Sequence, residues 1–290
     1  MKARKTARYD GLAEWYDERF VVDAEPHQPG LLDLLGPGSG PCLDIGCGTG
    51  RNLGTIRVSG RTPVGLDYSI DQLGRARTRT DGPLLHGDAA VLPFADASFD
   101  TAVSMWISTD VDDFGAVLRE AARVLRPGGI LVAYGVHPCF NGPHVVYEDD
   151  GRRTVHPTYR QSGWHTDMPW WGEDGIRRRI GMSHLTLADY LNAVVDSGLV
   201  IERFEEPGGY DIPHALAFRA RKAEDLGRLP DRDRGDRFGQ DGQVGCGGLG
   251  AGARVGGGSE GDGGQAQGRD GAYGNALDET DRHREPPSGW

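Results

Sequence analysis

The residues best suited to chemistry lie in a glycine-rich stretch from Leu43 to Gly50, which reads LDIGCGTG. Glycines at every second position, Gly46, Gly48 and Gly50, let the backbone turn sharply and approach a ligand without an intervening Cβ. A helix that begins after such a turn offers free N–H groups to a negatively charged group such as a carboxylate. The stretch therefore predicts a turn that binds a small ligand.

Further carboxylates end the next strand-like runs, RTPVGLD at Asp67 and PLLHGD at Asp88. Asp67 follows Gly46 by 21 residues, a distance that one helix and the next strand span. Carboxyl ends of parallel strands meet at one edge of a sheet, so Asp44, Asp67 and Asp88 are expected to lie close together. A single aspartate of this kind is commonly a turn or cap residue. Together with the glycine turn, the acids predict a nucleoside site, in which Asp67 accepts from ribose hydroxyls and Asp88 from an exocyclic amine.

The glycine stretch does not match two better-known phosphate-binding patterns. The dinucleotide fingerprint G-x-G-x-x-G/A requires a small residue where this chain has Arg51 or, in the other register, Leu53. A P-loop requires Gly-Lys-Ser/Thr, which does not follow. A nucleotide-dependent oxidoreductase on a similar sheet is therefore a weaker alternative.

Strand-like and helix-like segments alternate around these residues. The helices are expected from Val111 to Leu125, stopped by Pro127-Gly128-Gly129, and from Thr186 to Gly198. This α/β alternation predicts a doubly wound, mostly parallel seven-stranded sheet, a Rossmann-like fold. The seven expected strands are Pro41–Gly46, Arg61–Asp67, Pro83–Asp88, Phe99–Trp106, Gly129–Val136, Leu199–Glu205 and His214–Ala220.

These motifs resemble those of the class I S-adenosylmethionine-dependent methyltransferases of the small-molecule type. Residues 44–50 match the family's first motif, [D/E]-x-G-x-G-x-G, and Gly87–Phe94 is similar to its third-strand motif. Leu118–Gly129 is similar to the helix and turn before its fifth strand. Tyr9–Asp17 is similar to the N-terminal helix that often covers the cofactor. The resemblance spans roughly residues 9–222 and is most specific from 43 to 136.

The resemblance implies S-adenosylmethionine as the cofactor and a role for each matching position. It places the backbone of Gly46, Gly48 and Gly50 along the methionine portion and Asp44 at its ammonium. Asp67 is placed at the ribose hydroxyls and Tyr68 against the adenine, while Asp88 accepts from the adenine amine and the Ala89 N–H donates to a ring nitrogen. Met105 is placed near the sulfonium, and Tyr16 is a further cofactor contact.

The substrate pocket is expected in residues 137–184, which hold five of the nine histidines and three of the six tryptophans. Methyl transfer from a sulfonium depends mainly on alignment and requires a base only where the acceptor keeps its proton. His137 is the candidate catalytic base because it directly follows a predicted strand; His144 and Tyr159 rank below it. Alternatively, His137 has a purely structural role, and the tryptophans pack a subdomain instead of lining a pocket. No metal site is expected, because no H-x-x-x-H or H-E-x-x-H spacing or cysteine pair occurs here.

A small-molecule acceptor is expected, with O-, N- or C-methylation left open. The net charge of −11 disfavours nucleic acid and anionic membranes as partners. The Arg177–Arg179 run is interpreted as a solvated face rather than a basic patch. The amino-methylating DNA enzymes of the family carry Asn/Asp-Pro-Pro-aromatic where this chain has Ser104–Ile107. A methyltransferase-like protein without turnover, which acts as a binding or regulatory module, is the alternative function.

Composition sets the domain boundaries. Residues 223–290 hold 19 of the 46 glycines and only seven Leu, Ile, Val, Phe or Met. Ordering such a tail costs on the order of 100 kcal/mol, far more than those side chains return. We therefore expect one domain over 1–222, with its cofactor-binding core at about 41–136, and a disordered tail over 223–290. Whether that tail is a solvated extension or an out-of-frame reading stays open.

The cellular setting is expected to be the cytoplasm. The four cysteines form no regular framework, as is usual for reduced thiols. No apolar segment follows the basic N-terminus, so no signal peptide is predicted. The longest apolar stretch, Ile130–Val136, is far shorter than a membrane span. The oligomeric state is left open.

Overall fold

The computed structural model describes residues 7–21, 30–148, 150–209 and 211–224. Almost all of the tail predicted to be disordered, and Cys246 within it, lie outside the described residues.

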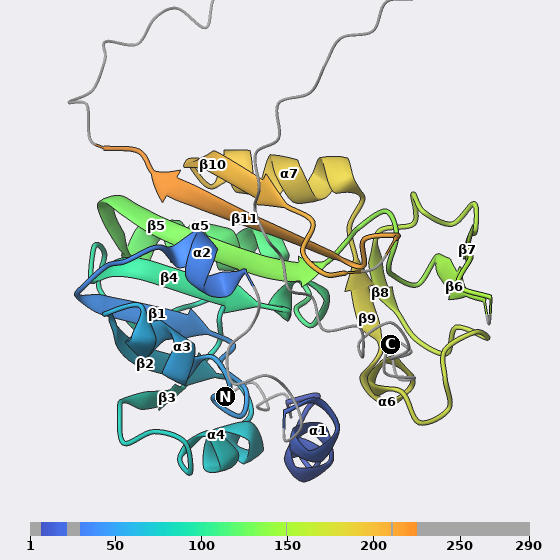
Figure 1. Cartoon of the computed structure of the whole chain (residues 1–290), viewed down its shortest axis with the longest axis horizontal. Coiled ribbons are helices and arrows are strands. Elements are labelled where there is room, and N and C mark those ends of the chain that lie inside the picture. The colour runs from blue at the N-terminus through green and yellow to red at the C-terminus, as the bar shows by residue number, and fades with distance from the viewer. Residues whose placement is uncertain (1–6, 22–29, 149, 210, 225–290) are drawn as a thin grey trace, which may run out of the picture. The chain divides into compact units, whose positions relative to one another are not determined.

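A seven-stranded sheet forms the centre of the fold (Figure 1). Its strand order is β10-β11-β5-β4-β1-β2-β3, and β11 runs antiparallel to both β5 and β10 while the other neighbouring pairs are parallel. The predicted doubly wound, mostly parallel sheet is confirmed. The strands are β1 (Pro41–Ile45), β2 (Thr62–Asp67), β3 (Leu84–His86), β4 (Phe99–Met105), β5 (Leu125–Val136), β10 (Leu199–Glu205) and β11 (Ala215–Lys222).

Helices cover both faces of this sheet and bury a separate hydrophobic cluster on each. The cluster under α5 and α7 includes Phe114, Leu118 and Tyr190, whereas the cluster under α2 and α3 includes Leu34 and Ile56. In Figure 1, α2 and α3 lie in front of the sheet and α5 lies behind it. The helices are α1 (Ala13–Phe20), α2 (Leu31–Leu35), α3 (Leu53–Val58), α4 (Ile70–Ala76), the 3-10 helix η1 (Ile107–Thr109), α5 (Phe114–Val124), α6 (Ile176–Ile180) and α7 (Leu187–Asp196).

Side-chain caps fix the beginnings of the two predicted helices. Asp113 accepts a hydrogen bond from the backbone of Ala116 at the start of α5, and Thr186 accepts one from Asp189 at the start of α7. The end of α5 differs from the prediction. Leu125 is already extended and pairs with Phe99, so the chain passes into β5 before the Pro-Gly-Gly sequence is reached.

Residues 137–184 form small elements beyond the end of β5. β6 (Val145–Tyr147) pairs with β7 (Arg153–Val155), and β8 (Gly163–His165) pairs with β9 (Met182–His184), both antiparallel. A hydrophobic cluster of Val136, Trp171 and Met182 joins this segment to the sheet.

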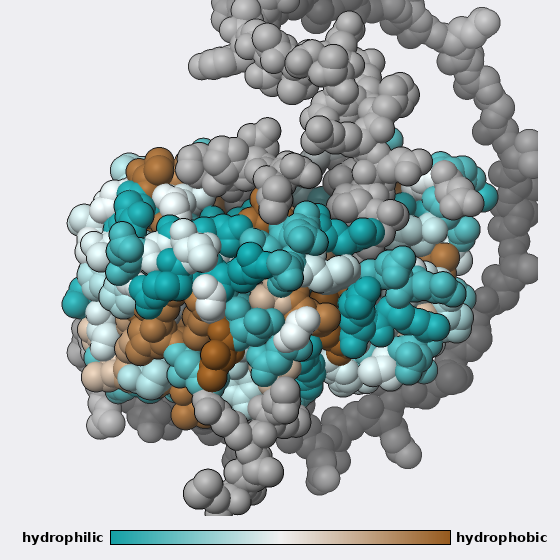
Figure 2. Space-filling model, turned by 90° about the horizontal axis from the view of Figure 1, so that it is seen from below, coloured by the Kyte–Doolittle hydropathy of each residue, from teal (hydrophilic) through white to brown (hydrophobic). Residues whose placement is uncertain are grey.

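The surface seen from below is mostly hydrophilic, with hydrophobic residues gathered in separate patches (Figure 2). Large hydrophobic side chains that remain exposed include Ile70, Val91 and Val200. Exposed apolar groups of this kind are common on folded proteins and do not by themselves indicate a binding site.

Candidate functional site

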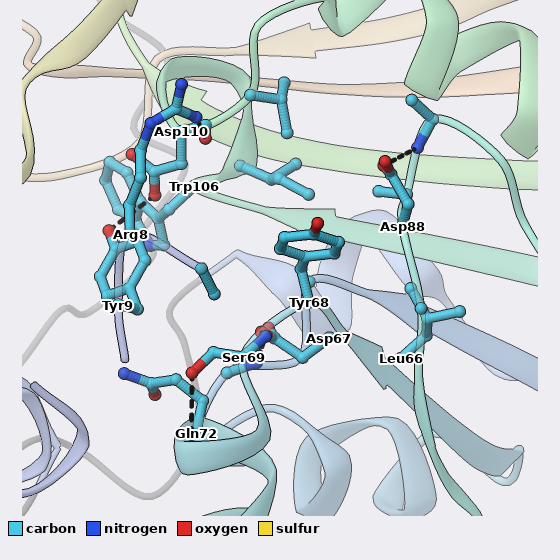
Figure 3. A pocket seen from close by; sticks show the side chains of 18 of the residues that line it. Arg8, Tyr9, Leu66, Asp67, Tyr68, Ser69, Gln72, Asp88, Trp106 and Asp110 are labelled. Atoms are coloured by element: carbon cyan, nitrogen blue, oxygen red, sulfur yellow. Dashed lines mark hydrogen bonds between the residues drawn. The ribbon is translucent and has the colours of Figure 1, made fainter. Parts of the chain in front are cut away.

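A cavity of about 460 Å³ lies where the order of the strands reverses, beside the carboxyl ends of β1, β2 and β4 (Figure 3). This is the place where open parallel sheets usually bind ligands. The turns after β1, β2, β3 and β4 and the segment around Tyr9 all contribute to its wall. Its lining includes eight of the residues predicted to bind the cofactor, namely Tyr16, Gly46, Gly48, Asp67, Tyr68, Asp88, Ala89 and Met105.

The glycine turn has a backbone that other residues rarely adopt. Gly46 has a φ of +73°, and a Cβ at that position would come within 2.8 Å of Ile107 Cδ1. Asp67 holds the turn from the neighbouring strand: its Oδ2 accepts from the Gly48 N–H at 2.8 Å and its Oδ1 from the Ser69 N–H at 2.8 Å. The floor of the cavity is therefore fixed by one carboxylate.

Asp44 lies just behind this turn, outside the cavity lining. It is fully buried, and neither of its carboxylate oxygens has a hydrogen-bond partner within the described residues. Burial, with a further contribution from the charge of Asp67, raises the pKa of Asp44 to about 7. A buried carboxylate without partners is costly, so this position fits a ligand that brings a cation or several hydrogen-bond donors.

Other unpartnered polar groups lie around the same turn. Gln72 lines the cavity, and neither its amide nitrogen nor its amide oxygen finds a partner in the described part of the chain although the side chain is buried. The buried hydroxyl of Thr49 likewise has no partner among those residues. Native proteins satisfy most buried polar atoms, so this concentration of unmet groups points to a polar ligand at the turn.

The segment around Tyr9 closes one side of the cavity. Asp71 on α4 anchors it by accepting hydrogen bonds from the N–H groups of Gly11 and Ala13 at 3.0 and 3.1 Å. Tyr9 donates its phenolic hydrogen to Asp110 Oδ2 at 2.7 Å, and Arg177 pairs with Asp110 Oδ1 at 2.5 Å. Burial, followed by the charge of Asp110, raises the pKa of Tyr9 well above its usual value.

The sequence placed Tyr9 in a segment similar to the helix that often covers the cofactor, but it did not predict the contacts of Tyr9 with Asp110 and of Asp110 with Arg177. Tyr9 and Asp110 are 101 positions apart, and Arg177 was interpreted as part of a solvated run. The structure corrects that interpretation, because the Arg177 side chain is only 4% exposed whereas that of Arg178 is 38% exposed. The isolated Arg-Arg-Arg sequence carries no signal that one of its members is buried.

Trp106 directly after β4 is a further feature that the sequence did not indicate. It lines the cavity and has a left-handed backbone with a φ of +64°, which bulky residues rarely adopt. Its ring packs against Tyr134, with the ring centroids 4.9 Å apart. Strained backbone at a cavity wall commonly marks a functional position.

Comparison with known proteins finds a methyltransferase domain in this chain. Residues 43–133 match the family model described as a methyltransferase domain. A solved S-adenosylmethionine-dependent methyltransferase from Mesorhizobium loti shares 27% sequence identity with a TM-score of 0.56, covering 69% of this chain and 99% of the other. This chain is therefore similar, over its methyltransferase domain, to the S-adenosylmethionine-dependent methyltransferases. The matched stretch contains the glycine turn and all three strand-end acids.

The curated relatives described below are similar to less than half of this chain. An uncharacterized protein from Methanocaldococcus jannaschii is 34% identical over 130 residues, 43% of this chain and 48% of its own length. The demethylmenaquinone methyltransferase of Renibacterium salmoninarum is 36% identical over 160 residues, 49% of this chain and 63% of its own. The chain thus spans about half the length of the curated relatives that it matches.

The residues of the methyltransferase domain fit S-adenosylmethionine, the cofactor of the family. The unpartnered carboxylate of Asp44 suits the ammonium of the methionine portion, and Gln72 offers a free amide beside the turn. Figure 3 shows Asp67 and Tyr68 at the floor and Asp88 across the cavity from Tyr9, an arrangement suited to an extended nucleoside. Asp88 Oδ1 accepts from the Ala90 N–H at 2.8 Å, which fixes the orientation of its carboxylate.

Gly50, like Asp44, is a predicted cofactor-binding residue that does not line the cavity. Its φ is +82°, and a Cβ there would lie 3.1 Å from the Ala76 side chain. Gly50 therefore allows the start of α3 to pack against α4. Its predicted contact with the methionine portion is untested.

The three candidates for a catalytic base lie outside the cavity lining. His137 is buried; its Nε2 lies 2.9 Å from Glu206 Oε1, and its Nδ1 accepts from the Cys139 N–H at 3.1 Å. Tyr159 accepts from the Leu187 N–H at 2.7 Å, and His144 Nε2 contacts the Cys139 carbonyl at 3.2 Å. The base role of His137 thus stays a prediction with no cavity contact in its support.

Within the residues that the structure describes, no helix is long and apolar enough to cross a membrane. Across the same residues, no three His, Cys, Asp or Glu side chains are grouped so that they could hold a metal ion.

Proposed function

We propose that this chain transfers the methyl group of S-adenosylmethionine to a small-molecule acceptor. The proposal rests on one observation: one continuous cavity has room both for a cofactor and for a small molecule beside it. One part of it is built from the acids and glycines suited to the cofactor, and another includes Tyr9 and Trp106, for which no cofactor role is predicted. A ligand pocket of this volume is typical for small molecules.

The cofactor, when bound, supplies a methyl group that the positive charge on sulfur has already activated. The task left to the chain is alignment, which can contribute about 7–11 kcal/mol to lowering the barrier. In this proposal Asp67 and Asp88 hold the nucleoside and Asp44, buried behind the glycine turn, attracts the ammonium. Met105, at the end of β4, and Trp106 then form the wall beside the reacting region.

A small acceptor fits this site better than a macromolecule. The cavity of about 460 Å³ has to hold both the cofactor and the acceptor. Asp110, Asp112 and Asp113 line it together with Arg8, so the charged groups of its lining are of both signs. Which of the O, N or C atoms is methylated is left to experiment. Demethylmenaquinone belongs among the first compounds to test because several relatives carry its name.

The test measures S-adenosylhomocysteine release from S-adenosylmethionine over a panel of phenols, amines and quinols that includes demethylmenaquinone. Acceptor-dependent release that Asp67→Ala abolishes supports methyl transfer. Strong S-adenosylhomocysteine binding without release on any compound favours the alternative, a binding or regulatory module.

A further inference from the structure

The hydroxyl of Tyr9 has only one way to interact with a molecule in the cavity. A phenol has a single O–H donor and otherwise accepts hydrogen bonds. Tyr9 gives that hydrogen to Asp110 Oδ2, 2.7 Å away. Its oxygen can therefore only accept a hydrogen bond from a molecule in the cavity that the ring lines.

The surroundings of Asp110 fix this direction of hydrogen bonding. Arg177 Nη1 pairs with Asp110 Oδ1, and Arg177 Nη2 donates to Thr109 Oγ1 at 3.0 Å. Arg8 donates to the backbone carbonyl of Asp110 at 3.2 Å. A carboxylate held in an ion pair accepts hydrogen bonds and donates none, so the Tyr9 hydrogen stays directed at it.

The walls next to Tyr9 are aromatic and apolar. Trp106, Ile107 and Met105 line the same cavity, and the Tyr9 ring meets the Tyr16 ring edge-on with centroids 5.7 Å apart. Figure 3 places Tyr9, Trp106 and Asp110 together on the side away from Asp88. A flat apolar molecule can pack against these rings, whereas an anion would meet the Tyr9 oxygen and the Asp110 carboxylate.

We propose that Tyr9 selects the acceptor by accepting a hydrogen bond from its O–H or N–H group, so that the acceptor class is an uncharged aromatic hydroxyl or amine. The inference rests on the proposed function and narrows its substrate class. Tyr9 is the residue that contacts the acceptor. Asp110 and Arg177 act through it as positioning residues.

The test uses the full chain saturated with S-adenosylhomocysteine and three probes of nearly equal shape: phenol, aniline and toluene. Dissociation constants come from ligand-observed NMR titrations. Phenol and aniline are expected to bind about fivefold or more tightly than toluene, as one neutral hydrogen bond predicts. In Tyr9→Phe, which keeps the ring, this preference is expected to disappear, so that the three probes bind with about equal dissociation constants.

Tyr190→Phe is the matched control, because it removes a phenol that packs in the core and lies outside the cavity lining. It is expected to keep the preference for phenol. The proposal is overturned if phenol does not bind, if toluene binds equally well, if Tyr9→Phe keeps the preference, or if Tyr190→Phe loses it to the same extent. S-adenosylhomocysteine binding is measured first, so failure of the cofactor site is distinguished from failure of the Tyr9 assignment.

Discussion

Gly48 donates its backbone N–H to Asp67 Oδ2 at 2.8 Å, and this bond ties the turn after β1 to the end of β2. The other oxygen of Asp67 accepts from Ser69 N–H at the same distance. One carboxylate thus shapes both of the turns that we propose to hold the cofactor. Burial raises the pKa of Asp67, and its backbone hydrogen bonds oppose that rise.

Asp67→Asn is expected to weaken S-adenosylhomocysteine binding at least about tenfold, because the amide NH₂ must face one of two backbone donors. Isothermal titration calorimetry measures the change. Asp196→Asn, at the exposed end of α7, is the control and should bind as the wild type does. An unchanged affinity in Asp67→Asn would show that the bridge between the turns is dispensable.

The affinity for S-adenosylhomocysteine should depend on the ionisation of Asp44. Its pKa is about 7 in the ligand-free protein, and the ligand's ammonium favours the ionised form. Affinity is therefore expected to fall as the pH drops from 8 to 6, by up to about tenfold. In Asp44→Asn the profile should be flatter and the affinity lower throughout. A wild-type profile as flat as that of the variant contradicts the role given to Asp44.

The same residue should make the ligand-free fold less stable at high pH. Its pKa is raised above the unfolded value, so its favourable contribution is complete below pH about 4 and is lost as the pH rises through about 7. Asp44→Asn should then raise the free energy of unfolding at pH 8 by about 1–3 kcal/mol. Urea titrations of both proteins at pH 5 and pH 8 measure this. If Asp44→Asn is less stable than the wild type at pH 8, the Asp44 carboxylate does not carry an uncompensated charge in the folded protein.

Trp106 allows a test of backbone strain. Alanine at a φ of +64° keeps the left-handed penalty of about 1 kcal/mol, whereas glycine does not. Trp106→Gly is therefore expected to be more stable than Trp106→Ala by about 1 kcal/mol, the reverse of the usual order. Chemical denaturation compares the pair, and equal or reversed stabilities rule out strain at this position.

Arg177 should be far more important to stability than its neighbours. Arg177→Met leaves the Asp110 carboxylate without its cationic partner and should lower the free energy of unfolding by about 3–5 kcal/mol. Arg178→Met, half-exposed and weakly paired, is the control and should change it by less than about 0.5 kcal/mol. Similar losses in both variants would contradict a special role for Arg177.

The sheet was predictable because its strands are short apolar runs with acids or glycines at their ends. Asp67 and Asp88 could be assigned to one edge because parallel topology brings strand ends together. The contact between Tyr9 and Asp110 could not be inferred, since no periodicity links residues 101 positions apart. For His137 the position after β5 was predictable but the direction of the side chain was not. The direction of its ring depends on contacts with Glu206 and Cys139, which the sequence does not indicate.

The most direct test of the central claim is a calorimetric titration of the wild type and of Asp67→Ala with S-adenosylhomocysteine, alongside NADH and NADPH. We predict micromolar binding of S-adenosylhomocysteine to the wild type, its loss in Asp67→Ala, and no binding of either nicotinamide cofactor. A folded wild-type protein that does not bind S-adenosylhomocysteine, or that binds NADH instead, would contradict the account.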